Sequence, residues 1–176
     1  NTAVGGDTVL HVGAPQFASN EGRVAVATIS FFFGSVHIST IDAAEVDMSL
    51  SGALGQFGKS VLALPDLNGD GTADTAVAAP LYDGDQGRVY ILHLHKNGSW
   101  LHTPAVPIAA VGAGWACSST DSDPALGSNG CPAGPPAANR FGMSLAFDAD
   151  AGQTVALLVG APGYNGNVGS VFVVQL

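Results

Sequence analysis

Short apolar runs alternate with polar turns rich in glycine, aspartate and asparagine along most of the chain. The runs are too short for helices of ordinary length, and many consist of valine, isoleucine and alanine without polar interruption. Such runs are typical of strands that are buried on both faces of a sheet. A helical pattern is missing, and residues 41–46 offer one turn at most. The pattern therefore predicts an all-β protein.

One arrangement of strands and turns occurs three times. An apolar strand ends in Ala-Pro, a polar loop follows, and a glycine opens the next strand, as in residues 7–26, 74–91 and 154–173. The pairs Phe57-Gly58 and Phe141-Gly142 open an additional strand before the second and third copies. The repetition predicts that each copy is one structural unit that stacks on its neighbours.

A fourth strand is expected at the end of each of the first two copies. Residues 34–38 and 98–102 both begin with Gly-Ser and continue into an apolar stretch. Asn97-Gly98, placed between two apolar runs, is typical of a two-residue hairpin turn. Four-stranded units of this kind predict a β-propeller segment of about three blades, the first and last incomplete. Further copies or repeats are expected to cover the open edges and apolar faces.

The composition restricts the partners of the chain. It has 176 residues, of which 47% are hydrophobic and 11% charged, with a net charge of −9. Nucleic acid and anionic lipid surfaces are unsuitable partners, because basic residues that would contact phosphates are scarce. No apolar run is long enough to span a bilayer. The missing initiator methionine and signal peptide favour a mature or excised segment.

The loop of residues 66–74 has the composition of a calcium site. Oxygen-bearing side chains stand at Asp66, Asn68, Asp70 and Asp74, and the Thr72 carbonyl can add a ligand. Calcium takes roughly six to eight oxygen ligands from carboxylates, amides and backbone carbonyls. Apolar flanks predict two antiparallel strands around the loop, instead of the helices of the helix–loop–helix calcium motif. The alternative is a turn whose side chains bond only their own backbone.

Two cysteines, Cys117 and Cys131, lie in a loop rich in serine, glycine, proline and aspartate. This setting predicts a disulfide bond that closes the loop and contributes about 3 kcal/mol in the chain-entropy model. A disulfide in turn predicts an oxidising compartment, whereas two free thiols would fit a cytosolic protein. The surrounding insertion, residues 105–140, is either a decorated surface loop or a partner-binding loop anchored by Trp115.

Three histidines near the expected hairpin form a second metal hypothesis. If Asn97-Gly98 makes the turn, His93 faces His102 across the hairpin, and His95 lies on the same side. Three imidazoles in this arrangement could hold zinc or copper. A half-solvated outer face of the sheet is the simpler interpretation.

The triplet Asn97-Gly98-Ser99 is an acceptor for N-glycosylation. Such triplets also arise by chance, and Asn-Gly already has a structural reason in a tight turn. The expected exposure of the turn and the predicted oxidising compartment favour a glycan on Asn97. Catalysis finds little support, because Ser60, Ser144 and Ser170 lie in or beside strands without a nucleophile elbow. We therefore expect no enzymatic activity.

The second copy carries the features of a known repeat. Phe57-Gly58, the acidic loop, Ala78-Ala79-Pro80 and residues 87–91 together resemble the FG-GAP repeat, which builds the β-propeller of integrin α subunits and related extracellular proteins. The resemblance covers nearly all of the second copy, much of the third and part of the first. It implies one calcium loop between the first two strands of a blade, since the third copy has a shorter loop without a closing acid.

The resemblance also implies a role for each residue of the loop. Asp66, Asn68, Asp70 and Asp74 match the side-chain ligands of the family, and Thr72 matches its carbonyl ligand. The predicted organisation is a single propeller segment of residues 1–176, with a partial blade at 1–50, the calcium-binding blade at 51–104, the Cys-bounded insertion at 105–140 and a partial blade at 141–176.

Three functions agree with this organisation. The first is an extracellular, secreted or cell-surface, calcium-binding propeller that recognises a protein or glycan ligand in adhesion. The second is a structural subunit of an extracellular filament or coat, assembled from further copies through its open blade edges. The third is an accessory domain of an extracellular hydrolase. A monomer that binds a ligand would favour the first, and spontaneous polymerisation would favour the second.

Overall fold

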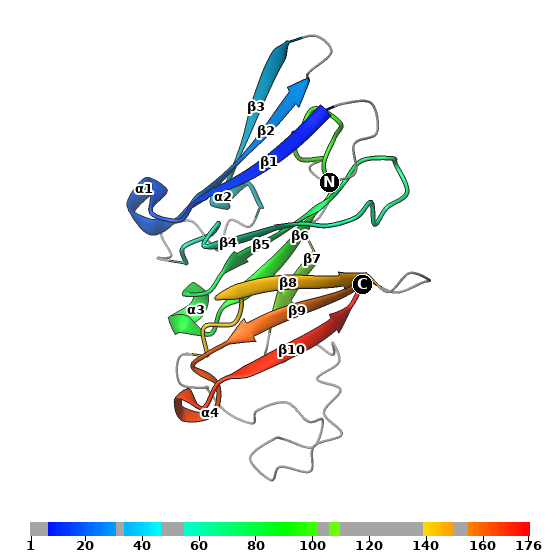
Figure 1. The fold of residues 1–176 in the computed structure, drawn as a ribbon. Coiled ribbons are helices and arrows are strands. Elements are labelled where there is room, and N and C mark those ends of the chain that lie inside the picture. The colour runs from blue at the N-terminus through cyan, green and yellow to red at the C-terminus, as the bar shows by residue number, and fades with distance from the viewer. Residues whose placement is uncertain (1–6, 31–33, 47–54, 102–105, 110–138, 150–154) are drawn as a thin grey trace.

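The computed structural model of the protein describes residues 7–30, 34–46, 55–101, 106–109, 139–149 and 155–176 (Figure 1). These residues form three antiparallel sheets, so the predicted all-β class is confirmed. The strands in chain order are β1 (Asp7–Ala14), β2 (Arg23–Ser30), β3 (Ser35–Asp42), β4 (Ser60–Ala63), β5 (Thr75–Ala79), β6 (Arg88–Leu92), β7 (Val106–Ala109), β8 (Ser144–Ala149), β9 (Val155–Ala161) and β10 (Ser170–Gln175).

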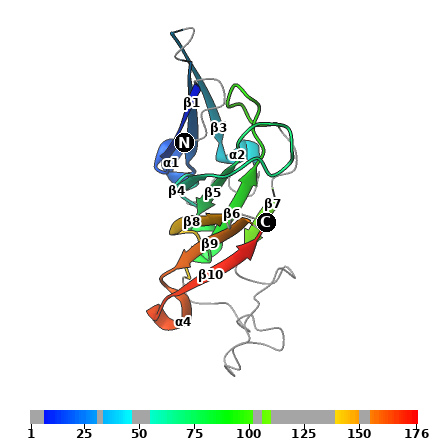
Figure 2. The same ribbon diagram turned by 45° about the vertical axis from the view of Figure 1, so that its right-hand side comes forward.

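Each sheet is made of strands that are consecutive in the chain. The first sheet has the order β1-β2-β3, the second β4-β5-β6-β7 and the third β10-β9-β8. Figure 1 and Figure 2 agree that the second sheet lies between the other two. The three sheets therefore follow one another as successive blades of a partial propeller.

The second sheet is covered on both faces. On one face, Val77 belongs to a core cluster that includes Val26 of β2. On the other face, Ala78 belongs to a cluster that includes Val159 of β9. Every residue of β5 is buried as a result. This arrangement explains why the sequence of β5 is apolar or small at neighbouring positions, with no solvent-facing alternation.

A short main-chain contact joins each pair of successive sheets, and we call these contacts the inter-sheet seams. Phe57 forms a parallel bridge with Gly22, and Phe141 forms one with Gly87. In each seam the phenylalanine N–H donates to the carbonyl of the residue before the glycine, over 3.0 and 3.1 Å. A Cβ on either glycine would overlap the phenylalanine carbonyl oxygen, so only glycine fits there.

The polar loop that follows each Ala-Pro folds into one irregular turn. The turns are α1 (Phe17–Asn20), α3 (Tyr82–Asp85) and α4 (Tyr164–Asn167). Left-handed backbone occurs at Asn20, Asp85 and Asn167, with φ of 73°, 66° and 73°. Asparagine and aspartate tolerate this region better than other residues with a side chain. The turns bring the seam glycines Gly22 and Gly87 against the next sheet.

The remaining helix, α2 (Ala43–Val46), is the single turn expected near residues 41–46. Within the ranges that the structure describes, no helix has the length and apolar character that a membrane crossing requires. Cys117, Cys131 and Trp115 lie outside those ranges. The predicted disulfide and partner-binding loop therefore stay predictions.

The fourth strand of the second sheet differs from the prediction. It is β7, which pairs with β6 with Val89 opposite Ile108, and not residues 98–102. β7 thus lies inside the stretch assigned to the insertion, residues 105–140. Pro107 weakens the strand signal in the sequence, but β7 is an edge strand, where a residue without an N–H is tolerated. In the first sheet, β3 does begin within residues 34–38.

His11, a partly buried residue of the first sheet, makes the stability of the protein depend on pH. It lies on β1 opposite Val26, and its Nε2 is buried with no hydrogen-bond partner among the described residues. Burial lowers the pKa of His11 below its ordinary value of 6.5. The unfolded chain therefore binds this proton more readily, and the free energy of unfolding should fall as pH drops below about 6.5.

Urea unfolding at pH 7.5 and pH 5.5 measures this effect. We expect the midpoint of the wild type to fall more between the two pH values than the midpoint of His11→Leu. Equal falls in both proteins would show that His11 does not contribute to the acid sensitivity.

Candidate metal centre

The loop of residues 66–74 connects β4 to β5 at one end of the second sheet. The two strands are antiparallel, as predicted, with Val61 opposite Val77. Two main-chain hydrogen bonds close the base of the loop. The Leu64 N–H donates to the Asp74 carbonyl over 2.8 Å, and the Asp74 N–H donates to the Pro65 carbonyl over 3.4 Å. The sheet therefore fixes both ends of the loop.

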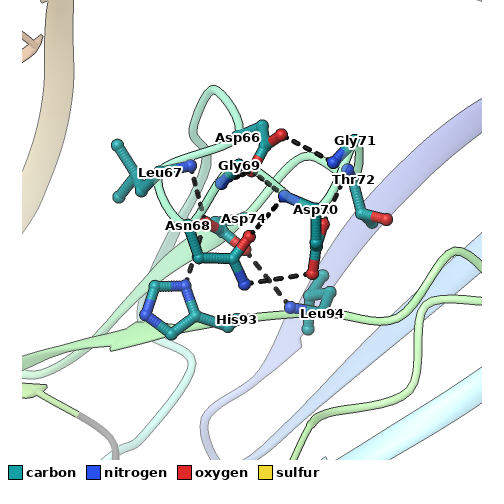
Figure 3. Close-up of polar contacts among 10 residues, drawn as sticks. All are labelled: Asp66, Leu67, Asn68, Gly69, Asp70, Gly71, Thr72, Asp74, His93 and Leu94. Carbon is teal, nitrogen blue, oxygen red and sulfur yellow. Dashed lines mark hydrogen bonds and ion pairs between the residues drawn. The ribbon is translucent and has the colours of Figure 1, made fainter.

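Asp66 organises the first half of the loop (Figure 3). Its Oδ1 accepts the N–H groups of Gly69 and Asp70 over 2.7 and 3.2 Å. Its Oδ2 accepts the Gly71 N–H over 2.7 Å. The chain can curl around this carboxylate because Gly69 and Gly71 have φ of 79° and 85°, which glycine adopts without steric cost.

Asn68 and Asp70 lie at the exposed tip of the loop. The Asn68 Nδ2 donates to Asp70 Oδ2 over 3.0 Å, and the Thr72 N–H donates to Asp70 Oδ1 over 2.8 Å. These bonds favour the ionised carboxylate. The bond from Asn68, followed by the bond from Thr72, therefore lowers the pKa of Asp70.

Asp74 anchors the loop from below and is fully buried. Its Oδ2 accepts the Leu67 N–H over 2.9 Å, and its Oδ1 accepts the Leu94 N–H over 3.3 Å. The His93 Nδ1 lies 3.0 Å from Oδ2. With Asp74 as a carboxylate, which can only accept, Nδ1 is the donor of this hydrogen bond. Asp74 thus connects the acidic loop to His93 and Leu94, which follow β6 (Figure 3).

The position of His93 corrects the histidine hypothesis. Leu94 pairs with Trp100, and the Leu101 N–H donates to the His93 carbonyl over 3.0 Å. His93 therefore lies opposite Leu101 and not opposite His102, because the turn has three residues instead of two. His102 itself lies outside the described residues. The sequence did not reveal the contact of His93 with Asp74.

The oxygen set of the loop fits a hard cation by its chemistry, with three carboxylates and an amide within residues 66–74. In this structure the oxygens are directed to N–H groups of the loop and of His93 and Leu94, which follow β6, as in a self-capped turn. Within the described ranges, no three or more His, Cys, Asp or Glu side chains are grouped so that they could hold a metal. Ion binding would therefore require Asp66, Asn68 and Asp70 to exchange N–H partners for the ion.

Comparison with known proteins places this site in context. Residues 57–92 match the model of the FG-GAP repeat. The chain is 38% identical to human integrin alpha-10 over 102 residues, which are 58% of the chain and 8% of that protein. It is 36% identical to bovine integrin alpha-2 over 93 residues, which are 51% of the chain and 7% of that protein.

A different kind of relative matches as well. The chain is 33% identical to mouse phosphatidylinositol-glycan-specific phospholipase D over 129 residues, which are 65% of the chain and 15% of that protein. The chain thus spans only a small share of the length of these relatives. The matched repeat runs from the Phe57 seam through the acidic loop to the end of β6, and the same strand and turn order recurs on either side of it. The chain therefore belongs to the FG-GAP repeat family.

Proposed function

We propose that the protein is a non-catalytic, extracellular β-propeller module that binds calcium at residues 66–74 and recognises a protein or glycan ligand. The observation that carries the proposal is the acidic loop between β4 and β5, held within a repeat that matches the FG-GAP model. The similarity to integrin alpha-10 and alpha-2 supports a role in adhesion. The oxidising compartment predicted from Cys117 and Cys131 agrees with an extracellular location.

Calcium would act on the loop as a structural ligand. Asp66, Asn68, Asp70 and the Thr72 carbonyl would hold it at the tip, and Asp74 would complete the set from the buried base. The ion would offset the mutual repulsion of these carboxylates. It would thereby hold β4 and β5 in register, and a ligand that binds only the folded state raises stability.

Calcium titration by calorimetry and by thermal melting tests this proposal. We expect calcium to raise the melting temperature and a chelator to lower it. Asp70→Asn removes one carboxylate while keeping an acceptor for the Thr72 N–H, and should weaken calcium binding about tenfold or more.

The matched control is Asp83→Asn, which removes the same charge from an exposed position of α3. Its affinity for calcium should equal that of the wild type. If calcium leaves the melting temperature of the wild type unchanged, the loop is a self-capped turn and the calcium proposal is wrong.

A structural subunit is the second candidate, and the third sheet carries the observation that favours it. Val171 and Val173 of β10 are 62% and 57% exposed, whereas Val89 and Ile91, in the same positions of the preceding repeat, are 0% and 3% exposed. Val89 and Ile91 are buried in the cluster that the second sheet shares with the third sheet. Val171 and Val173 form the equivalent apolar face of the third sheet, which is exposed. A further sheet would cover it in an assembly.

One experiment separates the two candidates. Sedimentation with calcium reports self-association, and a panel of extracellular matrix proteins and glycans reports ligand binding. Calcium-dependent binding by a monomer supports recognition. Concentration-dependent polymers without binding support the structural subunit instead. The phospholipase D relative adds a third candidate, an accessory domain of a hydrolase.

A further inference from the structure

The hairpin beyond β6 presents an asparagine at its tip. The Gly98 N–H donates to the His95 carbonyl over 2.7 Å, and the His95 N–H donates to the Ser99 carbonyl over 2.8 Å. These bonds enclose a three-residue loop of Lys96, Asn97 and Gly98. Asn97 is exposed, whereas Gly98 is buried.

The turn requires glycine at position 98 but does not require a positive φ at position 97. Gly98 has a φ of 82°, and a Cβ there would approach Val26 Cγ1 within 2.8 Å. Asn97 is not among the residues of positive φ. In a two-residue Asn-Gly turn both central residues need positive φ, so the geometry itself would favour asparagine. The three-residue loop removes this reason for asparagine, and the hydrogen bonds of its side-chain oxygen are the structural reason that remains.

The side chain of Asn97 is held by the third residue of its own triplet. Oδ1 of Asn97 accepts the Ser99 N–H over 3.1 Å and the Ser99 hydroxyl over 2.7 Å. Both bonds use the oxygen of the amide. Within the described part of the chain, no hydrogen bond uses the Asn97 Nδ2. A group attached to that nitrogen would therefore leave the hydrogen bonds of the turn in place.

We propose that Asn97 is an N-glycosylation site, an inference that rests on the extracellular location proposed above. The donor class is an oligosaccharide linked to a lipid pyrophosphate. A bond forms between C1 of the first sugar and Asn97 Nδ2, and the bond from C1 to the pyrophosphate oxygen breaks. One Nδ2 proton is lost, and the lipid pyrophosphate leaves. Ser99 supplies the hydroxyl that the acceptor triplet requires.

Secretion of the full chain from eukaryotic cells tests the site. We expect mass spectrometry to find a glycan on the peptide that contains Asn97, and peptide N-glycosidase to remove it and leave aspartate. Asn97→Gln and Ser99→Ala should lose this glycan. Ser99→Thr, the matched control, should keep it, since threonine also completes the triplet.

A secreted wild-type chain with unmodified Asn97 would overturn the proposal, as would a glycan that persists at Asn97 in Ser99→Ala. The result is separable from the proposed function. Native protein found inside the cell, together with a glycan on the secreted recombinant chain, would contradict the extracellular location while supporting Asn97 as an acceptor.

Discussion

Gly87→Ala is expected to lower the free energy of unfolding by about 3 kcal/mol, because it disrupts the seam between the second and third sheets. Gly87 has a φ of 84°, where a side chain costs about 1–2 kcal/mol. The new Cβ would also overlap the Phe141 carbonyl oxygen, so the Phe141 N–H would move from its acceptor, the Gln86 carbonyl. Equilibrium urea unfolding measures the loss.

The chain contains a matched control for this substitution. Gly169 occupies the same position in the third repeat with a φ of 82°, but the nearest atom to its Cβ would be the Pro162 carbonyl oxygen at 3.5 Å. Gly169→Ala should therefore cost only the backbone strain, about 1–2 kcal/mol. Equal costs for the two variants would show that the seam contributes nothing beyond backbone conformation.

Asp74→Ala is expected to destabilise the protein by about 3–4 kcal/mol even without calcium. The substitution leaves the N–H groups of Leu67 and Leu94 and the His93 Nδ1–H without their shared acceptor. Asp74 is fully buried, so water cannot replace it without opening the base of the loop. Chemical denaturation in the presence of a chelator isolates this effect from calcium binding.

Two variants help to interpret the result. Asp83→Asn removes an exposed carboxylate and should change the free energy of unfolding by less than about 0.5 kcal/mol. His93→Phe removes one donor to Asp74 and should cost less than Asp74→Ala, because the two main-chain donors remain. A chelated Asp74→Ala protein as stable as the wild type would mean that the buried hydrogen bonds do not hold the loop.

The sheets were predictable because strand and turn residues repeat together. The apolar run that ends at Ala79 is buried on both faces, which its lack of alternation indicated. The fourth strand was less predictable, because Pro107 argues against a strand in the interior of a sheet. Only the structure shows that β7 lies at the edge, where proline is tolerated. The register of the hairpin was missed because Asn97-Gly98 favours a two-residue turn. Packing of Gly98 against Val26, a contact between different repeats, accompanies the three-residue loop instead.

In the candidate site, too, local contacts were predictable from the sequence and contacts between distant residues were not. The hydrogen bonds of Asp66 and Asp70 lie within residues 66–74, so the self-capped turn could be foreseen from local spacing, and the calcium ligands stay a prediction. The partner of Asp74 is distant in sequence and depends on the register of β5 against β6, in which Thr75 lies opposite Leu92. Extending that register by one residue places Asp74 opposite His93. A sequence pattern alone does not fix the register, so this contact could not be predicted.

The arrangement of the sheets has a consequence for partial unfolding. Each core cluster is shared by only two neighbouring sheets, and the second sheet belongs to both. The first or third sheet can open while one cluster remains intact, whereas opening the second sheet exposes both clusters at once. Backbone amides of β5 therefore exchange with solvent only when most of the described structure has opened, and those of β1 and β10 exchange through smaller, local events.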